Sequence, residues 1–425
     1  MTLSNQSVMP TYGRFPIAIE RGEGSYLWDT DGKKYLDFCM GIAVCTLGHS
    51  HPKLVEAISK QAASLMHCSN LYQIPQQTEL ADTIVETVVG EPGKVFFCNS
   101  GAEANDAMVK LARKFGYEVP NASGEPRHDV ITFRNSFHGR TLGGIAATGQ
   151  EKVKVGFDPA LPGFFHVALN DLDALKAAIT DKTVAIMFEP LQGEGGINLV
   201  DASFLKAVAD LCREHNLLLM LDEVQCGIGR MGDWCGWKVA LDDADIELTP
   251  DVVSWAKGLG GGFPIGAIWA RDRAVSPERD DLRLCDVLGP GTHGSTYGGG
   301  PLASTAALTV IREIEEANLI PHVIAMEQKI TTQVASWSSP FFKELKGRGL
   351  MLGFELNESA FDHEDLGGKT PALHIVFKLM EQGLLTVPAG PLVVRWLPAL
   401  NVTEAEVDEA LKIFETVLSE LNQTP

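Results

Sequence analysis

Short, almost continuously apolar runs recur through the middle of this chain, and amphipathic stretches separate them. The runs are Val95–Cys98, Val130–Phe133, Val184–Phe188, Leu217–Leu221 and Val252–Trp255. A strand with one face in water alternates polar and apolar residues, whereas a continuously apolar strand is covered on both faces. Helices on both sides of a mostly parallel sheet provide that cover. The pattern therefore predicts an α/β fold around such a sheet.

The stretches between the runs carry apolar residues at helical spacing. After the first run these residues are Ala104, Ala107, Met108, Leu111, Ala112 and Phe115. Steps of three and four residues place them on one face of an α-helix. From Pro301 onward the pattern changes to longer helices and short mixed strands. We expect a large domain at residues 56–300, a smaller α+β domain at 301–425, and an N-terminal segment at 1–55 that packs with the smaller domain.

The charge of the chain argues against one class of partner. Lys and Arg total 35 and Asp and Glu total 55, so the net charge is −20. A field of this sign repels the phosphate backbone of nucleic acids. We therefore expect small-molecule ligands, and any anionic ligand must be held by a few local cations.

The cysteines and the N-terminus indicate a cytoplasmic protein. None of the eight cysteines has the C-x-x-C spacing of a zinc or redox site, which favours reduced core thiols. Residues 1–10 lack the basic start and apolar stretch of a secretory signal, and no apolar run is long enough to span a bilayer.

His49 and His51 precede Pro52 and a helical pattern, so they predict a helix start and not a metal site.

Polar residues directly follow several of the predicted strands. They are Asn99–Ala102, Ser136–Arg140, Glu189, Asp222–Gln225 and Lys257. Ligands of open α/β sheets bind beyond the carboxyl ends of the strands, so we expect one site at that edge. Ser100, Gly101 and Ala102 span a strand-to-helix junction, where backbone amides and the helix dipole attract anions. A buried lysine at a strand end, such as Lys257, has a lowered pKa and can form an imine.

Together these segments resemble the class-III aminotransferases, and they are most similar to the acetylornithine aminotransferase group. The resemblance extends from about Tyr12 to Leu400. Its motifs are Arg21–Gly24, Leu47–Pro52, Phe97–Asn105, Ser136–Gly143, Glu189–Gly196, Asp222–Gln225, Ala256–Gly262 and His293–Gly299. The resemblance implies a fold-type-I transferase dependent on pyridoxal 5'-phosphate, with a seven-stranded, mostly parallel sheet. It also implies a homodimer with active sites at the interface.

The resemblance assigns roles around this cofactor. Lys257 would hold the cofactor aldehyde as an imine and later move a proton. Asp222 would keep the ring nitrogen protonated, which makes the ring an electron sink. Gln225 would bind the ring hydroxyl, and Phe137 and Val224 would lie against the two ring faces. The other implied cofactor contacts are Ser100, Gly101, Ala102, Glu189 and, from the neighbouring subunit, Thr296.

The resemblance also assigns substrate contacts. Arg140 and Arg395 would each bind a carboxylate, because a planar guanidinium offers it two hydrogen bonds. Glu194 would shield Arg395 while a diamino donor is bound. Ser295 and Tyr12 are further expected contacts, although an N-terminal aromatic residue is as readily explained by packing.

The implied reaction moves the distal amino group of N2-acetyl-L-ornithine to 2-oxoglutarate, giving N-acetylglutamate semialdehyde and glutamate, a step of arginine biosynthesis. Ornithine, succinylornithine and 4-aminobutyrate aminotransferases remain alternatives within the same fold. A non-catalytic cofactor-binding protein would not need Lys257 and Asp222 together. A dinucleotide-dependent oxidoreductase would need an early glycine-rich βαβ fingerprint, which is missing. The glycines Gly258–Gly262 follow the lysine and do not open such a unit.

Overall fold

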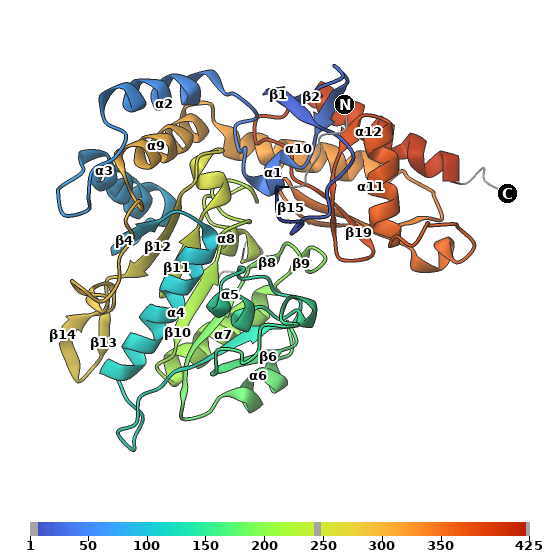
Figure 1. The fold of residues 1–425 in the computed structure, drawn as a ribbon. Coiled ribbons are helices and arrows are strands. Elements are labelled where there is room, and N and C mark those ends of the chain that lie inside the picture. Colours follow the sequence, from blue (N-terminus) through green and yellow to red (C-terminus); the bar gives the residue numbers. More distant parts are fainter. Residues whose placement is uncertain (1–6, 242–247, 422–425) are drawn as a thin grey trace.

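The computed structural model describes residues 7–241 and 248–421, and a seven-stranded sheet forms the centre of its large domain (Figure 1). In spatial order the strands are β4 (Gly93–Cys98), β12 (Gly266–Arg271), β11 (Val252–Trp255), β10 (Leu218–Asp222), β7 (Thr183–Phe188), β5 (Asp129–Phe133) and β6 (Phe164–Val167). Strand β12 runs antiparallel to both neighbours, and the other neighbouring pairs are parallel. The predicted α/β fold with a mostly parallel seven-stranded sheet is confirmed.

Strand β10 shows why these strands are apolar along their whole length. Leu218 and Met220 belong to one buried cluster, whereas Leu219 and Leu221 belong to another. Successive side chains of a strand point to opposite faces of the sheet. Each face of the sheet therefore has its own core, and the strand carries no solvent-facing row of polar residues.

Helices supply the second layer of each core. Helix α4 (Gly101–Glu118) packs across β12, β11, β10 and β7 on one face. Helix α7 (Ala202–Glu214) packs on β10 and β7, and its residues Phe204, Leu205 and Val208 belong to the opposite core. Helix α4 begins three residues after β4 ends, so its N-terminus lies near the carboxyl edge of the sheet. The helical face predicted from Ala104 to Phe115 is buried.

Three further helices, which come from distant parts of the chain, pack together beside the central sheet (Figure 1). Helix α9 (Pro301–Glu316) packs on both α2 (Pro52–Ser64) and α3 (Pro75–Thr83). Each of the three begins with proline, whose fixed backbone suits the first turn and whose missing amide is not needed there. The predicted helix start after His51 is thus confirmed.

The C-terminal part forms a second sheet beside the first domain. It orders β15 (Phe342–Arg348), β16 (Met351–Leu356), β19 (Val393–Trp396) and β18 (Val387–Ala389), all antiparallel. Helices α10 (Leu319–Val334), α11 (Pro371–Glu381) and α12 (Glu404–Leu421) accompany it. The N-terminal strands β1 (Ile19–Glu23), β2 (Tyr26–Asp29) and β3 (Lys34–Asp37) lie at the same end of the molecule (Figure 1), where β3 pairs in parallel with β17 (Leu384–Leu385).

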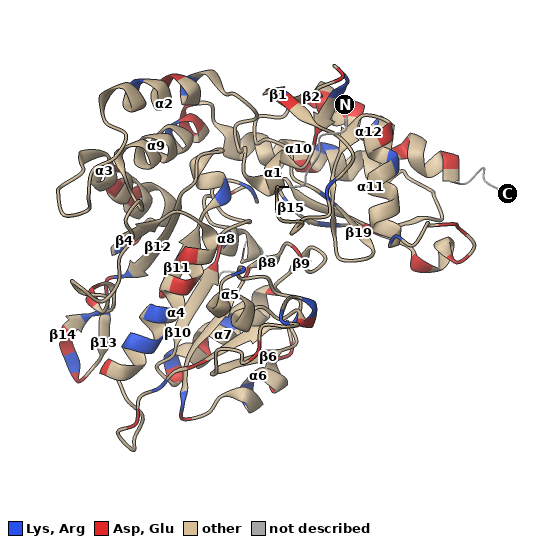
Figure 2. Ribbon diagram, viewed as in Figure 1, with Lys and Arg blue, Asp and Glu red and all other residues tan. Residues whose placement is uncertain are grey.

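The remaining elements are short. They are α1 (Met40–Ala43), η1 (Ile84–Val89), α5 (Leu142–Ala147), η2 (Glu151–Val153), α6 (Leu172–Ala178), β8 (Leu191–Gln192), β9 (Asn198–Leu199), α8 (Gly236–Ala240), η3 (Lys257–Gly260), β13 (Ala274–Ser276), β14 (Arg279–Arg283), η4 (Leu284–Asp286) and η5 (Glu358–Phe361). Charged residues gather on the outer helices and loops (Figure 2), and those of the central strands stand at or next to a strand end, namely Lys94, Asp129, Asp222 and Arg271. Among the described helices, none combines the length and the apolarity needed to cross a bilayer.

A third apolar cluster joins the two domains. Leu191, Ile197, Cys226 and Met231 come from the large domain, and they pack with small-domain residues of β16, β18 and β19. The seam lies next to the carboxyl edge of the central sheet. Side chains of the two domains therefore converge where the sequence predicts a ligand.

Candidate active site

A cavity of about 380 Å³ lies at the carboxyl edge of the central sheet. Ten of the residues predicted to form a site contribute to its lining, namely Ser100, Gly101, Ala102, Phe137, Arg140, Glu189, Asp222, Val224, Gln225 and Lys257. They come from loops that follow five different strands. The structure thus brings these separated segments together.

One end of the cavity is formed by the N-terminus of α4. Ser100 caps this helix, because its hydroxyl accepts a hydrogen bond from the amide of Glu103 at 3.2 Å. The next residue has to be glycine, since a Cβ on Gly101 would lie 2.7 Å from Val224 Cγ1. The amides of Gly101 and Ala102 belong to the first helical turn, which has no intrahelical acceptor. This end of the cavity suits an anion such as a phosphate.

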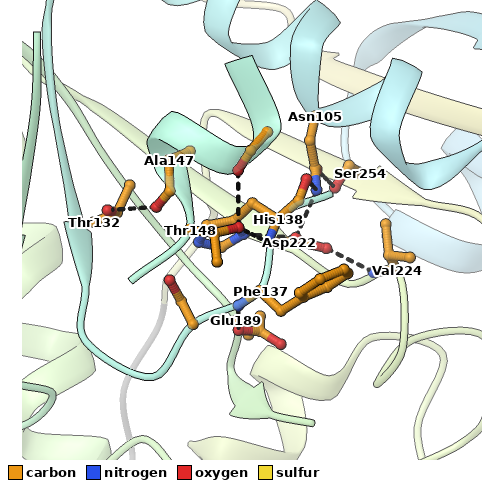
Figure 3. Close-up of polar contacts among 12 residues, drawn as sticks. Asn105, Thr132, Phe137, His138, Ala147, Thr148, Glu189, Asp222, Val224 and Ser254 are labelled. Carbon is orange, nitrogen blue, oxygen red and sulfur yellow. Dashed lines mark hydrogen bonds and ion pairs between the residues drawn. The ribbon is translucent and has the colours of Figure 1, made fainter. Parts of the chain in front are cut away.

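The opposite end holds a buried carboxylate (Figure 3). Asp222 is 2 % exposed, and its Oδ2 accepts hydrogen bonds from Asn105 Nδ2 at 2.7 Å and from the His138 ring at 2.8 Å. Its Oδ1 accepts one from the amide of Val224 at 3.0 Å. Asn105 in turn accepts a hydrogen bond from the Ser254 hydroxyl at 2.8 Å. The network fixes the carboxylate in one orientation.

The side chains that support Asp222 were not predicted from the sequence. Asn105 lies one turn beyond Gly101 on the buried face of α4, and a polar residue at that position was the available signal. His138 lies beside Phe137 in the motif but carries no pattern that separates support from packing. Burial lowers the pKa of His138, yet its hydrogen bond to Asp222 and the charges of Asp222 and Glu189 together raise it overall.

Glu189 closes the wall beneath Phe137. Its two carboxylate oxygens accept hydrogen bonds from the amides of Phe137 at 3.0 Å and Gly193 at 3.2 Å. Burial, together with the nearby Asp222 carboxylate, raises the pKa of Glu189 to about 7. In this position Glu189 holds two loops together, and the Phe137 ring is left to line the cavity.

Lys257 begins the short helix η3, directly after β11. Its backbone φ of +41° lies in the left-handed region, which is uncommon for a residue with a side chain. Gly258 follows, and a Cβ there would lie 2.7 Å from Thr46 Oγ1. Burial lowers the pKa of Lys257, which favours its neutral, nucleophilic form.

Arg395 approaches the cavity from the small domain. It is fully buried, and its Nη1 donates to Glu194 Oε1 and to Gln225 Oε1, each at 2.7 Å. The Nε and Nη2 atoms of Arg395 are buried without a hydrogen-bond partner among the described residues. Burial acts to raise the pKa of Glu194, but the charge and hydrogen bond of Arg395, with further contributions from Lys257 and Gln225, together lower that pKa overall. Two donors of the guanidinium therefore stay available for a second carboxylate.

Of the other predicted substrate contacts, Arg140 lies at the rim of the cavity, and Ser295 and Tyr12 lie outside its lining. Arg140 is exposed at the cavity rim, with its guanidinium 5.4 Å from the Phe137 ring centre. Ser295 accepts a hydrogen bond from Asn99 Nδ2 at 3.1 Å, and the exposed Thr296 follows it; neither lines the cavity. Tyr12 is 76 % exposed and is also absent from the lining.

Within residues 7–241 and 248–421, no group of three or more His, Cys, Asp or Glu side chains is arranged to hold a metal ion. Cysteines of the described region are all free.

An anion-binding helix end, a buried carboxylate and a nucleophilic lysine around one cavity define an enzyme that holds a phosphorylated cofactor. A family model, aminotransferase class-III, matches residues 7–418, and the chain belongs to this family, whose members use pyridoxal 5'-phosphate. The residues present fit that group, with α4 for the phosphate, Asp222 for the ring nitrogen and Lys257 for the aldehyde.

Several relatives of known name are similar to this chain over nearly its whole length. The acetylornithine aminotransferase of Caldanaerobacter subterraneus is 46% identical over 423 residues, which cover 99% of each chain. That of Synechocystis is 44% identical over 97% of this chain and 92% of its own. Among solved structures, the N-acetylornithine aminotransferase of Stenotrophomonas maltophilia is similar with a TM-score of 0.78 and 34% identity, over 97% of this chain and 98% of its own. The ornithine aminotransferase of Toxoplasma gondii has a TM-score of 0.87 at 30% identity, over 99% and 93% respectively.

Proposed function

We propose that this aminotransferase moves the distal amino group of N2-acetyl-L-ornithine to 2-oxoglutarate, which gives N-acetylglutamate semialdehyde and glutamate. The full-length curated relatives that share 46% and 44% of its residues carry that activity in their names. The single structural observation that supports the proposal is the buried Arg395 paired with Glu194. An enzyme that accepts both a diamino acid and glutamate needs a carboxylate clamp that can be covered and uncovered.

Pyridoxal phosphate, when bound, supplies an aldehyde that accepts the amino group and a ring that delocalises negative charge. We assign its phosphate to the amides of Gly101 and Ala102. Asp222, held by three hydrogen bonds, keeps a proton on the ring nitrogen. Burial lowers the pKa of Lys257, so its amine loses a proton more readily than an exposed lysine does and can attack a carbonyl and carry a proton.

The ring faces and the ring hydroxyl have matching side chains. Phe137 and Val224 line the cavity and are assigned to opposite faces of the ring. Gln225 already accepts a hydrogen bond from Arg395 through Oε1, so its amide group can donate to the ring hydroxyl. Gln225 thereby connects the ring site to the carboxylate clamp.

The two arginines divide the substrates between them. Arg140 at the rim is assigned to the α-carboxylate of the diamino donor, whose reacting amine lies at the far end of the molecule. Arg395 is assigned to the α-carboxylate of glutamate, which reacts at its α-amine and must place that carboxylate deeper. Glu194 covers Arg395 while the diamino donor is bound. Ser295 and Tyr12 are retained as secondary candidates for donor contacts.

A homodimer is part of the proposal, with Thr296 reaching the phosphate site of the partner subunit. Thr296 is exposed and lies in a loop held to a second loop by hydrogen bonds from Asn70 to the Ser295 and Gly298 carbonyls. Large apolar side chains stand exposed on these two loops, namely Leu65, Met66, Leu71, Tyr72 and Tyr297. Exposed apolar groups of this size and density mark protein interfaces.

Ornithine is the second candidate donor, because the ornithine aminotransferase of Toxoplasma gondii has a similar fold over 99% of this chain.

We also propose a cytoplasmic location, in keeping with the eight cysteines and their free thiols in the described region. Both substrates are small and charged, as expected for a biosynthetic enzyme of that compartment.

A panel of amine donors with 2-oxoglutarate tests the proposal, with glutamate formation as the readout. The donors are N2-acetylornithine, ornithine, N2-succinylornithine and 4-aminobutyrate at equal concentrations. We expect the highest kcat/KM for N2-acetylornithine. Equal or higher values for free ornithine would reassign the enzyme to that donor, and no glutamate from any donor would remove the proposed function.

A further inference from the structure

Glu194 lies in the turn Gly193–Ile197, which joins strands β8 and β9. Three of the five residues in this turn are glycine. Glycine has the widest conformational freedom of all residues, so the glycines themselves do not orient the Glu194 side chain. On the large-domain side the turn is held by one hydrogen bond and by close packing: the Gly193 amide donates to Glu189 Oε1 at 3.2 Å, and a Cβ on Gly195 would lie 2.2 Å from the Asn135 carbonyl oxygen. On the side that faces Arg395 the contacts come from the small domain.

Ile197, at the end of the turn, is held by the small domain. The residue is 1 % exposed, and its φ of +54° lies in a region that a β-branched residue rarely adopts. Such a conformation persists only where the surroundings enforce it. Cβ atoms built on Gly347 and Gly353 would lie 3.0 Å from Ile197 Cγ2 and 2.8 Å from Ile197 Cγ1. The side chain thus fills a slot that exists because both strand positions are glycine.

The slot adjoins the strand that carries Arg395. Gly353 on β16 and Arg395 on β19 are direct partners in the antiparallel register. One end of the turn therefore places Ile197 over Gly353, and the middle of the turn places the Glu194 carboxylate on Arg395. Both contacts fall on the same pair of facing residues.

A polar contact supports the same end of the turn. Lys346 Nζ, on β15, donates to Asn198 Oδ1 at 2.7 Å. Asn198 Nδ2 donates to the carbonyl of Gly195 at 2.9 Å, within the turn itself. Lys346 is also the register partner of Gly353. The turn is thus fastened to the small domain by one apolar and one polar contact.

We propose that Ile197 and Lys346 are positioning residues that set how strongly Glu194 covers Arg395. They touch neither substrate nor cofactor. They act by holding the turn on the small domain, which makes the Glu194–Arg395 contact depend on the packing of the two domains. The inference rests on the proposed function, because it assigns these residues the balance between the diamino donor and glutamate.

Two variants test the inference through independent contacts. Ile197→Ala empties the slot. Lys346→Met removes the hydrogen bond to Asn198, together with a 3.5 Å ion pair to Glu355, from a partly exposed side chain. In both, Glu194 should compete less for Arg395. We expect the ratio of kcat/KM for N2-acetylornithine to kcat/KM for glutamate, from single half-reactions, to fall about fivefold, as for directly coupled residues. Glutarate, an unreactive dicarboxylate, should bind the cofactor-loaded variants more tightly by a similar factor in calorimetry.

Val239→Ala is the matched control. Val239 on α8 packs against the same interdomain cluster but belongs to neither the turn nor its slot. General loosening of the cluster would change Val239→Ala and Ile197→Ala alike, and that result overturns the inference. An unchanged ratio with unchanged or weaker glutarate binding in both test variants also overturns it. If the native enzyme makes no glutamate from any donor, the proposed function fails, while the glutarate comparison still decides the role of Ile197.

Discussion

The Arg395 guanidinium of the small domain lies 2.7 Å from the Glu194 carboxylate of the large domain, and the arginine is fully buried. A buried arginine is tolerated when a carboxylate pairs with it. The same pairing prevents the arginine from binding a substrate carboxylate at full strength. The contact is therefore the point at which this site can choose between two kinds of substrate.

Glu194→Gln removes the competing charge and keeps the shape of the side chain. Hydrogen bonds to charged groups contribute about 1.5–3 kcal/mol, so we expect KM for glutamate to fall about tenfold or more. Half-reactions followed by the absorbance of the bound cofactor measure the effect. The control Glu118→Gln changes a glutamate at the C-terminal end of α4 that pairs with Lys114 at 2.7 Å, and its KM for glutamate should stay at the native value.

Lys257→Ala should abolish the reaction. General acid–base catalysis alone contributes about 10²–10⁴-fold in rate, and this variant also loses the amine that attacks the aldehyde. The absorbance of the covalently held cofactor should disappear from the purified protein. Lys60→Ala, on the exposed face of α2 where Lys60 pairs with Glu56, serves as the control and should retain both signals. Native turnover in Lys257→Ala would contradict the proposed mechanism.

Asp222→Asn tests the buried carboxylate. Removing one partner of a buried charge pair costs about 3–5 kcal/mol, which corresponds to at least a hundredfold loss in cofactor affinity or kcat. Equilibrium dialysis with pyridoxal phosphate and steady-state rates separate the two effects. Asp251→Asn is the matched control, because Asp251 is buried beside Arg273 but lies outside the cavity lining. It should lower the free energy of unfolding and leave cofactor affinity unchanged.

The strands and the positions of the site loops could be predicted from the sequence because they depend on local patterns. Each continuously apolar run became a strand of the central sheet, although Val95 and Phe96 on the edge strand β4 are only partly buried. Asp222 ends β10 and Lys257 follows the adjacent strand β11. The support of Asp222 could not be predicted. Its contacts with His138 and Asn105 join residues 84 and 117 positions apart, and they arise only when loops from different strands meet.

The residues assigned to substrate binding could likewise not be paired from local sequence patterns. The pairing of Glu194 with Arg395 was implied by family resemblance, since nothing local relates residues 201 positions apart. The packing of Ile197 against the small domain, which positions that turn, could not be predicted for the same reason. It depends on two glycines in strands of the other domain, which by sequence alone read as ordinary turn or strand-end residues. Packing across domains decides such contacts, and no short-range pattern encodes it.

Leu71→Asp tests the proposed dimer. Leu71 is 88 % exposed on the loop that adjoins the Thr296 segment, and a buried unpaired carboxylate would destabilise an interface there. We expect a shift toward monomer in sedimentation velocity together with weaker cofactor binding, since Thr296 could no longer reach its partner's site. Tyr117→Asp, at the exposed end of α4 with 63 % exposure, should sediment as the native protein does. A monomeric native protein with full activity would contradict the assignment of Thr296.

His49 should make stability depend on pH. Burial lowers its pKa, but a 2.8 Å contact with Asp37 and one with Cys45 raise it to about 9 overall, against 6.5 for an unperturbed histidine. A base whose pKa is raised by folding stabilises the native state fully below pH 6.5, and that stabilisation disappears as pH rises through 9. The free energy of unfolding of the native protein should exceed that of His49→Gln by more at pH 6.5 than at pH 9.5. Urea titrations of both proteins at the two pH values measure this, and equal differences would show that His49 is neutral in the folded state.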